Sequence, residues 1–431
     1  MNSNIILKFS NKINANNFFC LLFISSFFVL IFSKFVADLF LTTVSIYVFI
    51  KIFNNKDFNF FRKEIFFFIM MIYIFLNSII NGNDLILNIK SFALIRFPLF
   101  ILFPFIFEFK NISNLNNRII IIVKIILFLF IVDLFIQYFL GENILGYKYN
   151  DNYQRASGFF NDENIAGSFL FFTFVIYLSY TFAYKYDEKN LYFLLLIYLA
   201  IFISGDRTPF IMINLFLFIN FIWFFKKLSK NFFYILKFFI YIIIGLFIIF
   251  LIKPEAIDKY TNTAKAIVKD INTEKIQDYK YKKKFIFERW DYYSHYTKAY
   301  VIYKNNKLIG TGYKSFRFVC DDIKYNKDYS KFTNNLKRNG CSTHPHNIYM
   351  EVLSDLGLIG FILLILFIYN MLMMKKLISN EYLRVFYIAF LITYFFPLKP
   401  FGSFYTNIQL IFMTTTISYI IFIDRLRLNK K

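Results

Sequence analysis

The chain has few of the side chains that most often carry chemistry. Its 431 residues include three histidines and three cysteines. Two of the histidines stand in residues 343–347, but two histidines and distant acidic residues match the spacing of metal ligands poorly. We therefore predict neither a metal site nor another cofactor. Because histidine exchanges protons near neutral pH, this segment is where we expect proton transfer.

Long hydrophilic stretches are also scarce, with one exception at residues 253–346. Hydrophobic residues make up 58% of the chain, and its mean hydropathy is +0.51. A soluble domain of this size could not bury so much apolar side chain. The apolar runs are too long for barrel strands, and helices then remain as the structure that pairs all backbone groups in lipid. We therefore predict an all-α integral membrane protein.

Twelve apolar runs are candidates for membrane-spanning helices, judged against the ~20 residues that one crossing needs. No small-residue cleavage site follows the first run, so we expect a retained helix and not a signal peptide. The predicted organisation is nine helices in residues 1–252, a large external loop in residues 253–346, and three helices with a short tail in residues 347–431. The runs are residues 17–33, 35–53, 65–80, 91–107, 119–140, 164–184, 191–205, 208–225, 232–252, 347–373, 382–398 and 404–424.

The net charge of +22 is compatible with nucleic-acid binding, but the charges occur in short clusters between apolar runs. We therefore predict membrane lipids, and not nucleic acid, as partners. With the N-terminus in the cytoplasm, most basic residues of the short connections lie on the inner side, which is the usual bias. Both termini are then cytoplasmic and the long loop is external. The short outer connections carry Lys34, Lys90, Lys148, Arg155, Arg207 and Lys399.

The long loop has its own local signals. Residues 285–303 place aromatic and apolar residues near helical spacing, which predicts an amphipathic helix. Residues 310–312, Gly-Thr-Gly, predict a turn. Cys320 and Cys341 both lie in this loop, on the side where disulfides persist, so we predict a bridge in preference to two free thiols.

Arginines occur near helix ends on the predicted outer side. Arg155 precedes the sixth helix, Arg207 stands in a tight turn before the eighth, and Arg289 begins the loop helix. His344 and His346 stand where the tenth helix begins. The planar guanidinium fork suits phosphate oxygens. Together, the arginines would suit a diphosphate leaving group, and a histidine would suit the role of proton acceptor.

Two ionisable residues are predicted inside the membrane. Arg96 in the fourth helix and Asp133 in the fifth lie at depths that differ by roughly 3 Å, at 1.5 Å per residue. Charges in lipid are costly and usually pair or line a cavity. We expect Arg96 and Asp133 to pair, or both to face the substrate cavity. Glu351 and Asp355, at the start of the tenth helix, are expected to be solvated.

A motif in the last third of the chain resembles a known family. His346-Asn347, nine residues and then Gly357-x-x-Gly360 are similar to the signature of the O-antigen ligase family. The twelve-helix plan, with a large external loop between helices nine and ten, is similar as well. Three further matches are Arg155-Ala-Ser-Gly, Ser-Gly-Asp-Arg207, and Arg289-Trp290 leading into Leu308-Ile-Gly-Thr-Gly-Tyr.

The resemblance covers the second half of the chain well and the first third only by topology. Asp206 departs from the pattern, because members of the family often have a small or hydroxyl residue there. This departure puts the charge around Arg207 in doubt.

The resemblance implies a metal-independent glycosyltransferase of the bacterial inner membrane. Its donor would be a glycan on a polyprenyl diphosphate such as undecaprenyl diphosphate. Its acceptor, on the periplasmic face, would be lipid A-core, as in lipopolysaccharide biosynthesis, or a growing glycan. His346 would take or orient the proton of the acceptor hydroxyl. The diphosphate and substrate would be held by Arg155, Arg207, Arg289, His344 and Asn347.

Several alternatives stay open at this point. O-antigen ligase, O-antigen polymerase and protein-glycosylating relatives share the architecture. A polysaccharide transporter or flippase is the alternative from another class; transporters often consist of two related halves, and this chain shows no such symmetry.

For the single residues, the alternatives are structural. His346 could merely hydrogen-bond at the helix start, His344 could only shape the turn, and Asn347 could be an N-cap. His295 is expected on the surface of the loop helix. Gly357 and Gly360 are expected to permit close helix packing.

Overall fold

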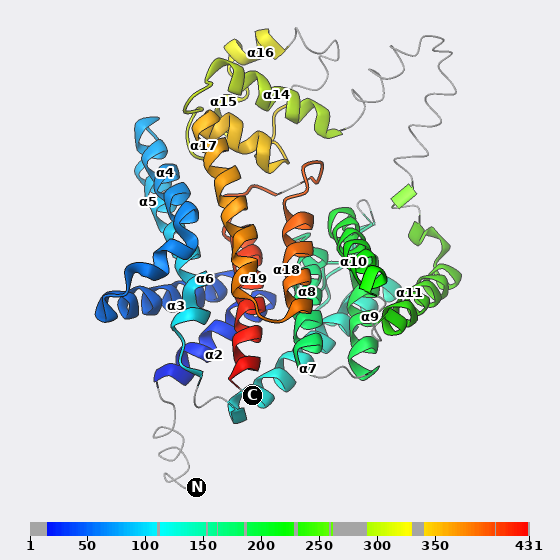
Figure 1. The fold of residues 1–431 in the computed structure, drawn as a ribbon. Coiled ribbons are helices and arrows are strands. Elements are labelled where there is room, and N and C mark those ends of the chain that lie inside the picture. The colour runs from blue at the N-terminus through cyan, green and yellow to red at the C-terminus, as the bar shows by residue number, and fades with distance from the viewer. Residues whose placement is uncertain are drawn as a thin grey trace, which may run out of the picture.

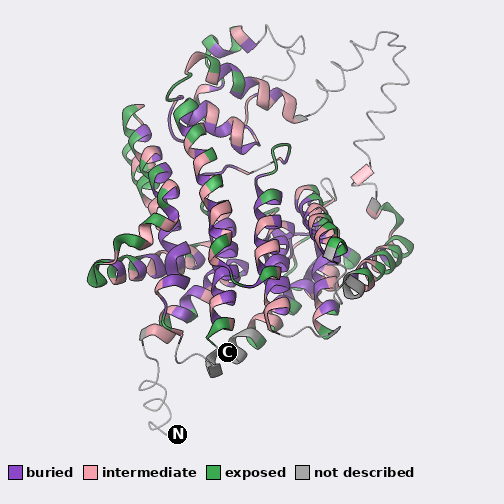
Figure 2. Ribbon diagram, in the orientation of Figure 1, coloured by how far each residue is buried: buried purple, intermediate pink, exposed green. Residues whose placement is uncertain are grey.

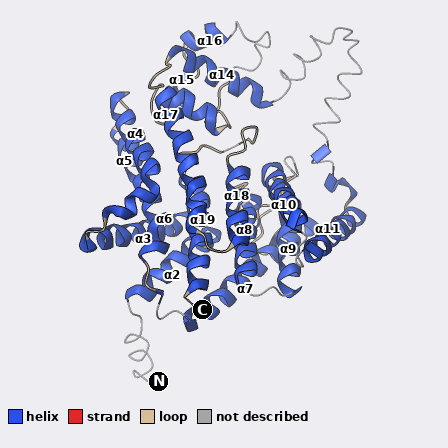
Figure 3. Cartoon of the chain, viewed as in Figure 1, coloured by secondary structure: helices blue, strands red, loops and turns tan. Residues whose placement is uncertain are grey.

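The computed structural model describes residues 15–109, 113–151, 154–161, 163–184, 188–227, 232–257, 260–261, 291–329, 340–400 and 402–429. Within these ranges the chain consists of helices and loops (Figure 3). Two isolated β-bridges join Glu142 with Lys148 and Asn150 with Arg155. The all-α fold class is therefore confirmed.

Each of the twelve predicted runs coincides with helical structure. The first nine correspond to α2 (Ala15–Phe28), α3 (Lys34–Asn55), α4 (Ile65–Ile80), α5 with α6 (Leu85–Phe92, Arg96–Ile106), α7 (Ser113–Leu140), α8 (Ala166–Tyr184), α9 (Glu188–Ile203), α10 (Arg207–Lys227) and α11 (Phe232–Ile252). The last three correspond to α17 (Ile348–Met373), α18 (Glu381–Tyr394) and α19 (Asn407–Leu428).

Shorter elements complete the described chain. The long loop contains α14 (Asp291–Asn305), α15 (Phe316–Val319) and α16 (Ile323–Tyr329). Short 3-10 turns are η1 (Val29–Ile31), η2 (Phe58–Glu64), η3 (Ala93–Ile95), η5 (Gly158–Phe160), η6 (Pro254–Ile257) and η7 (Met374–Leu377).

By length and composition, 8 helical segments in the described part of the chain can cross a membrane. Three shorter apolar helices, Asn16–Ile31, Lys189–Ile203 and Leu236–Ile252, accompany them. The protein is therefore a multi-pass membrane protein, while the number of twelve crossings stays a prediction.

The helices form one bundle with the loop elements at one end. Figure 1 shows α14, α15 and α16 beyond the start of α17, whereas α2 and the end of α19 lie at the opposite end of the bundle. Burial shows which helices are central: 83% of the most apolar stretch of α19 is buried, against 39% for α3. Figure 2 shows exposed residues along the outward faces of α3, α4 and α11, where a membrane protein meets lipid.

Helix α17 is broken at Gly357, which has φ 66° and ψ −162°. Glycine is essentially the one residue that adopts this backbone conformation. The helix is kinked there, and Figure 1 shows that α17 changes direction along its length. A break of this kind leaves backbone N–H and C=O groups without helical partners, and unpaired backbone groups are costly in an apolar bundle.

The partners come from residues 307–316, which we call the docking segment. Its backbone lies so close to α17 that a Cβ atom on Gly357 would collide with the Leu308 carbonyl. Close packing at this glycine was predicted, but the structure brings up a loop and not a helix. The bonds are Thr311 N–H to the Ser354 oxygen (3.1 Å), Gly312 N–H to the Asp355 oxygen (2.8 Å) and Leu358 N–H to the Lys307 oxygen (2.8 Å).

Helix α4 holds the docking segment from its other side. The Asn77 Nδ2 donates to the Ile309 oxygen at 2.7 Å. The Tyr73 hydroxyl donates to the Leu356 oxygen at 3.0 Å and so satisfies one more carbonyl at the break. The long loop is therefore fixed to the bundle between α4 and α17.

The acids at the start of α17 take part in the same attachment. Glu351 and Asp355 are 2% and 1% exposed, so the prediction that they are solvated is wrong. The Asp355 Oδ1 accepts the Phe316 N–H at 3.0 Å, and the Glu351 Oε2 accepts the Phe404 N–H at 2.7 Å. They are buried because they bind backbone groups of neighbouring segments.

Gly357→Ala tests the attachment. The backbone conformation alone should cost about 1–3 kcal/mol in alanine, and the methyl group should add to this because it meets the docking segment. Gly82→Ala is the matched control, because Gly82 has φ +69° and no atom within 4 Å of its Cβ position. In thermal unfolding of the purified variants, Gly357→Ala should unfold at a clearly lower temperature than Gly82→Ala. Equal unfolding temperatures would contradict this account.

Candidate functional site

His346 lies where the long loop meets the bundle. It has a positive φ of 58° and directly precedes the N-cap of α17. The next residue fixes its position: the Asn347 Oδ1 accepts the N–H groups of Tyr349 at 3.0 Å and Met350 at 3.2 Å. The Asn347 Nδ2 donates to the Pro397 oxygen at 2.7 Å. Asn347 is thus a buried N-cap that ties α17 to the connection between α18 and α19.

All three histidines of the chain meet around His346. Its ring centroid lies 4.2 Å from that of His344 and 5.3 Å from that of His295. The Tyr292 ring lies at 5.3 Å, in an edge-to-face arrangement. The prediction that His295 is a surface histidine is therefore wrong, because the ring is partly buried against this cluster.

Helix α14 supplies one face to this cluster. Tyr292 and His295 are three residues apart, so they lie on the same side of the helix. The His295 Nδ1 is 2.9 Å from the Gly340 oxygen. A carbonyl only accepts, so this bond requires the hydrogen on Nδ1 and leaves Nε2 bare in the neutral ring. The three-residue spacing of Tyr292 and His295 is visible in the sequence. It does not predict the cluster, because nothing in the sequence shows that residues 340–347 pack against α14.

A disulfide holds the histidine-bearing segment to the loop. Cys320 and Cys341 are bonded, with their Cα atoms 5.6 Å apart. Cys320 belongs to a small apolar core of the loop, formed by Ala299, Val301, Ile302, Phe316, Cys320, Tyr325 and Tyr329. The segment that carries His344 and His346 is therefore attached to a packed structure at one end and to α17 at the other. Cys20 is a free, buried cysteine.

The environment keeps His346 uncharged. Burial, followed by the repulsion of His344 and His295, lowers the pKa of His346 to about 3. The imidazole is then neutral at pH 7 and has a lone pair that can accept a proton. It is, however, a weak base until negative charge arrives nearby.

The turns that carry two of the predicted arginines, Arg155 between α7 and α8 and Arg207 between α9 and α10, lie side by side. The Arg155 Nε lies 3.5 Å from the Asp206 Oδ1, and Arg207 is the exposed first residue of α10. The Ala156 N–H donates to the Ser204 oxygen at 3.2 Å, which joins the two turns. Asp206, the residue that departs from the family pattern, therefore pairs with Arg155, and its Oδ2 also accepts the Gly167 N–H at 3.2 Å.

The predicted pairing of Arg96 with Asp133 is wrong. The Arg96 Nη2 binds both oxygens of Asp38 on α3, at 2.8 and 3.1 Å. The Asp133 carboxylate accepts from the Asn143 Nδ2 and from the Ile144 N–H, each at 3.0 Å. The sequence predicted similar depths in the membrane for Arg96 and Asp133. In the structure α6 packs against α3, so Arg96 meets Asp38 of α3 instead.

Arg289 lies outside the described residues, so its place at the site stays a prediction. Arg155 lies between α7 and α8, and Arg207 begins α10, whereas the histidine cluster lies on α14 and just before α17.

Removal of the His344 ring should raise the pKa of His346. In His344→Ala one repelling neighbour is lost and burial is reduced, and both changes favour the protonated ring. The chain has three histidines, so the NMR titration of histidine-labelled protein has few signals. We expect the His346 signal to titrate at a higher pH in His344→Ala, moving from about 3 towards the ordinary value of 6.5. The exposed Thr343→Ala variant keeps all three rings, and an equal shift there would contradict the assignment.

The comparisons with known proteins agree with this geometry. The family model described as O-antigen ligase matches residues 191–365, which run from α9 to the part of α17 just beyond its break. No curated protein and no solved structure matches the chain. The matched part contains Arg207, the three histidines and the glycine break. Residues 191–365 of the chain are therefore similar to the O-antigen ligase family.

Proposed function

We propose that the protein transfers a glycan from a polyprenyl diphosphate to an acceptor hydroxyl, with His346 as the group that receives the hydroxyl proton. The family supports glycan transfer of the O-antigen ligase or polymerase type. The observation that carries the proposal is the neutral His346, fixed by the Asn347 cap at the junction of loop and bundle. Positioned proton acceptors of this kind contribute roughly 10²–10⁴-fold to a rate.

In the proposed reaction the acceptor oxygen forms a bond to the anomeric carbon of the donor glycan. The bond from that carbon to the diphosphate oxygen breaks, and its electron pair leaves with the diphosphate. The hydroxyl proton passes to an imidazole nitrogen of His346. The negative diphosphate counteracts the repulsion from His344 and His295, so donor binding raises the pKa of His346 and makes it a stronger base.

Arg207 and Arg155 are the proposed diphosphate ligands among the described residues. Charge-assisted, forked hydrogen bonds from guanidinium groups suit phosphate oxygens. Asp206 pairs with Arg155 and offsets part of its charge, and Arg207 is exposed at the start of α10. Arg289 would complete the set.

The proposed location is the bacterial inner membrane, with the site on the periplasmic face. The arrangement supports this, because α2 begins and α19 ends at the end of the bundle opposite to the loop (Figure 1). The His346 to Gly360 motif favours an O-antigen ligase that uses lipid A-core. A polymerase that joins repeat units is the second candidate.

His346→Ala should abolish transfer in cells at unchanged protein level. We expect a loss of at least about 100-fold in the initial rate of glycan transfer by the purified protein. Lys324→Ala is the control, because this exposed residue of α16 lies on the same loop and has no proposed role. Full activity of His346→Ala would refute its assignment.

Deletion of the gene separates the two candidate acceptors. Loss of all polymer from the lipid A-core is expected for a ligase, and core that carries one repeat unit is expected for a polymerase. An unaltered surface glycan would contradict both.

A further inference from the structure

A polar cavity lies beside the arginine turns and has no role in the reaction described so far. Its volume is about 310 Å³, and it opens among the ends of α7, α9 and α11. This volume is at the lower end of the range for small-molecule sites, about 300–1,000 Å³. Its lining includes Tyr138, Tyr149, Gln154, Lys253, Glu255 and Tyr260.

One buried group in this cavity lacks a partner. Tyr138 is 4% exposed, and its hydroxyl has no hydrogen-bond partner among the described residues. A buried hydroxyl without a partner has lost its hydrogen bonds to water without replacement, which is unfavourable in free energy. A group that enters the cavity and hydrogen-bonds to this hydroxyl would recover that free energy.

The other walls combine aromatic rings with polar groups. The Lys253 Nζ lies 4.4 Å from the Tyr138 ring centroid and 4.9 Å from that of Tyr149. The Tyr260 ring stacks on Phe202 at 5.1 Å, and its hydroxyl donates to the Phe202 oxygen at 2.7 Å. Donors, carboxylate acceptors and ring faces together suit a sugar, which presents hydroxyl groups at its edge and C–H groups on its faces.

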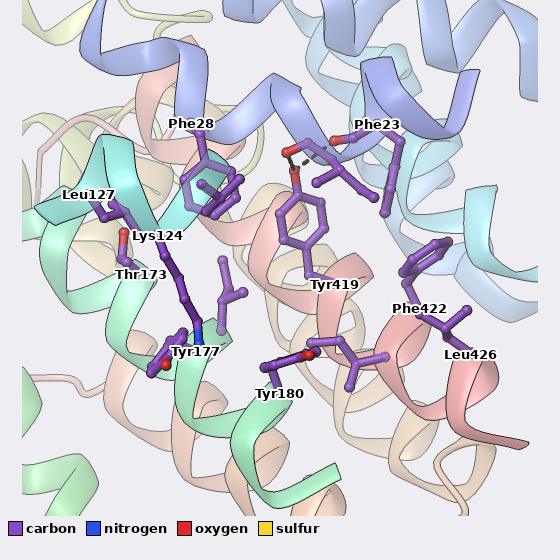
Figure 4. A pocket seen from close by; sticks show the side chains of 14 residues that line it. Phe23, Phe28, Lys124, Leu127, Thr173, Tyr177, Tyr180, Tyr419, Phe422 and Leu426 are labelled. Atoms are coloured by element: carbon purple, nitrogen blue, oxygen red, sulfur yellow. Dashed lines mark hydrogen bonds between the residues drawn. The ribbon is translucent and has the colours of Figure 1, made fainter. Parts of the chain in front are cut away.

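A second cavity differs from the polar cavity in its chemistry. It measures about 100 Å³, lies between α2, α7, α8 and α19, and is lined almost wholly by carbon (Figure 4). The Tyr177 hydroxyl in its wall is already bonded to the Asn190 Oδ1 at 2.6 Å. Lys124 extends along this cavity towards Tyr177, and its Nζ also reaches the Asn190 Oδ1, at 3.3 Å (Figure 4). This cavity therefore presents no unsatisfied polar group of the kind that Tyr138 presents.

The position of the polar cavity indicates which sugar it would hold. Gln154 in its wall directly precedes Arg155, and Gly205 in its wall lies two residues before Arg207. A diphosphate held by these arginines would place the sugar attached to it beside the cavity. We propose that this cavity binds the first sugar of the lipid-linked donor, an inference that rests on the proposed function.

The test compares two probes on the purified full-length protein in lipid nanodiscs. One is undecaprenyl diphosphate, and the other is undecaprenyl diphosphate that carries one N-acetylhexosamine. We expect the wild type to bind the glycosylated probe at least about tenfold more tightly, which corresponds to about 1.4 kcal/mol. Tyr138→Phe, which removes only the hydroxyl, should lose most of this ratio and leave the affinity for the bare carrier unchanged.

Two further variants test whether the affinity ratio depends on the polar cavity. Lys253→Met should also reduce the ratio, whereas Tyr177→Phe, which removes a hydroxyl from the apolar cavity, should not. Equal affinity of the wild type for both probes, or an unchanged ratio in Tyr138→Phe, would overturn the sugar site and leave the proposed transfer intact. If neither probe binds to the wild type, the proposed function fails and the sugar site fails with it.

Discussion

The structure depends on the hydrogen bonds that pair the backbone groups at the break in α17. Gly357 interrupts α17, and the backbone groups released there would be unpaired in an apolar bundle. The docking segment, residues 307–316, pairs with them through its own backbone. The close approach requires glycine at Gly310, where a Cβ atom would collide with the Asp355 backbone. Because the segment belongs to the long loop, this pairing also determines where the loop sits. A membrane helix and a hydrophilic loop are thereby joined by main-chain bonds at the border between them.

The candidate site follows from this attachment. The loop core and the Cys320–Cys341 disulfide hold one end of the histidine-bearing segment, and the Asn347 cap holds the other. His346 is thus positioned by both the loop and the bundle. Helix α14 then brings His295 to the cluster, and the resulting repulsion and burial keep His346 neutral. We propose that this neutral imidazole receives the proton of the acceptor hydroxyl.

The sequence predicted the helices well, because long apolar runs have few alternatives in lipid. The predicted Cys320–Cys341 bridge is confirmed, and the role of His344 and His346 stays a prediction. It failed where the answer depends on how helices rotate against one another: Arg96 faces Asp38 because α6 packs on α3, and no periodicity shows this. It also failed for His295, Glu351 and Asp355. These polar residues were assigned to solvent, whereas segments distant in the sequence cover them: residues 340–346 cover His295, Phe404 binds Glu351, and Phe316 binds Asp355.

Hydrogen exchange of the backbone amides tests the central claim, that the docking segment completes the broken helix. Thr311, Gly312 and Leu358 N–H groups donate across the break. We predict that these three amides exchange as slowly as amides in the middle of α17, although two of them lie in a loop rich in glycine. Fast exchange at Thr311 and Gly312, together with slow exchange in the rest of α17, would show that the loop is not attached there and would contradict the account.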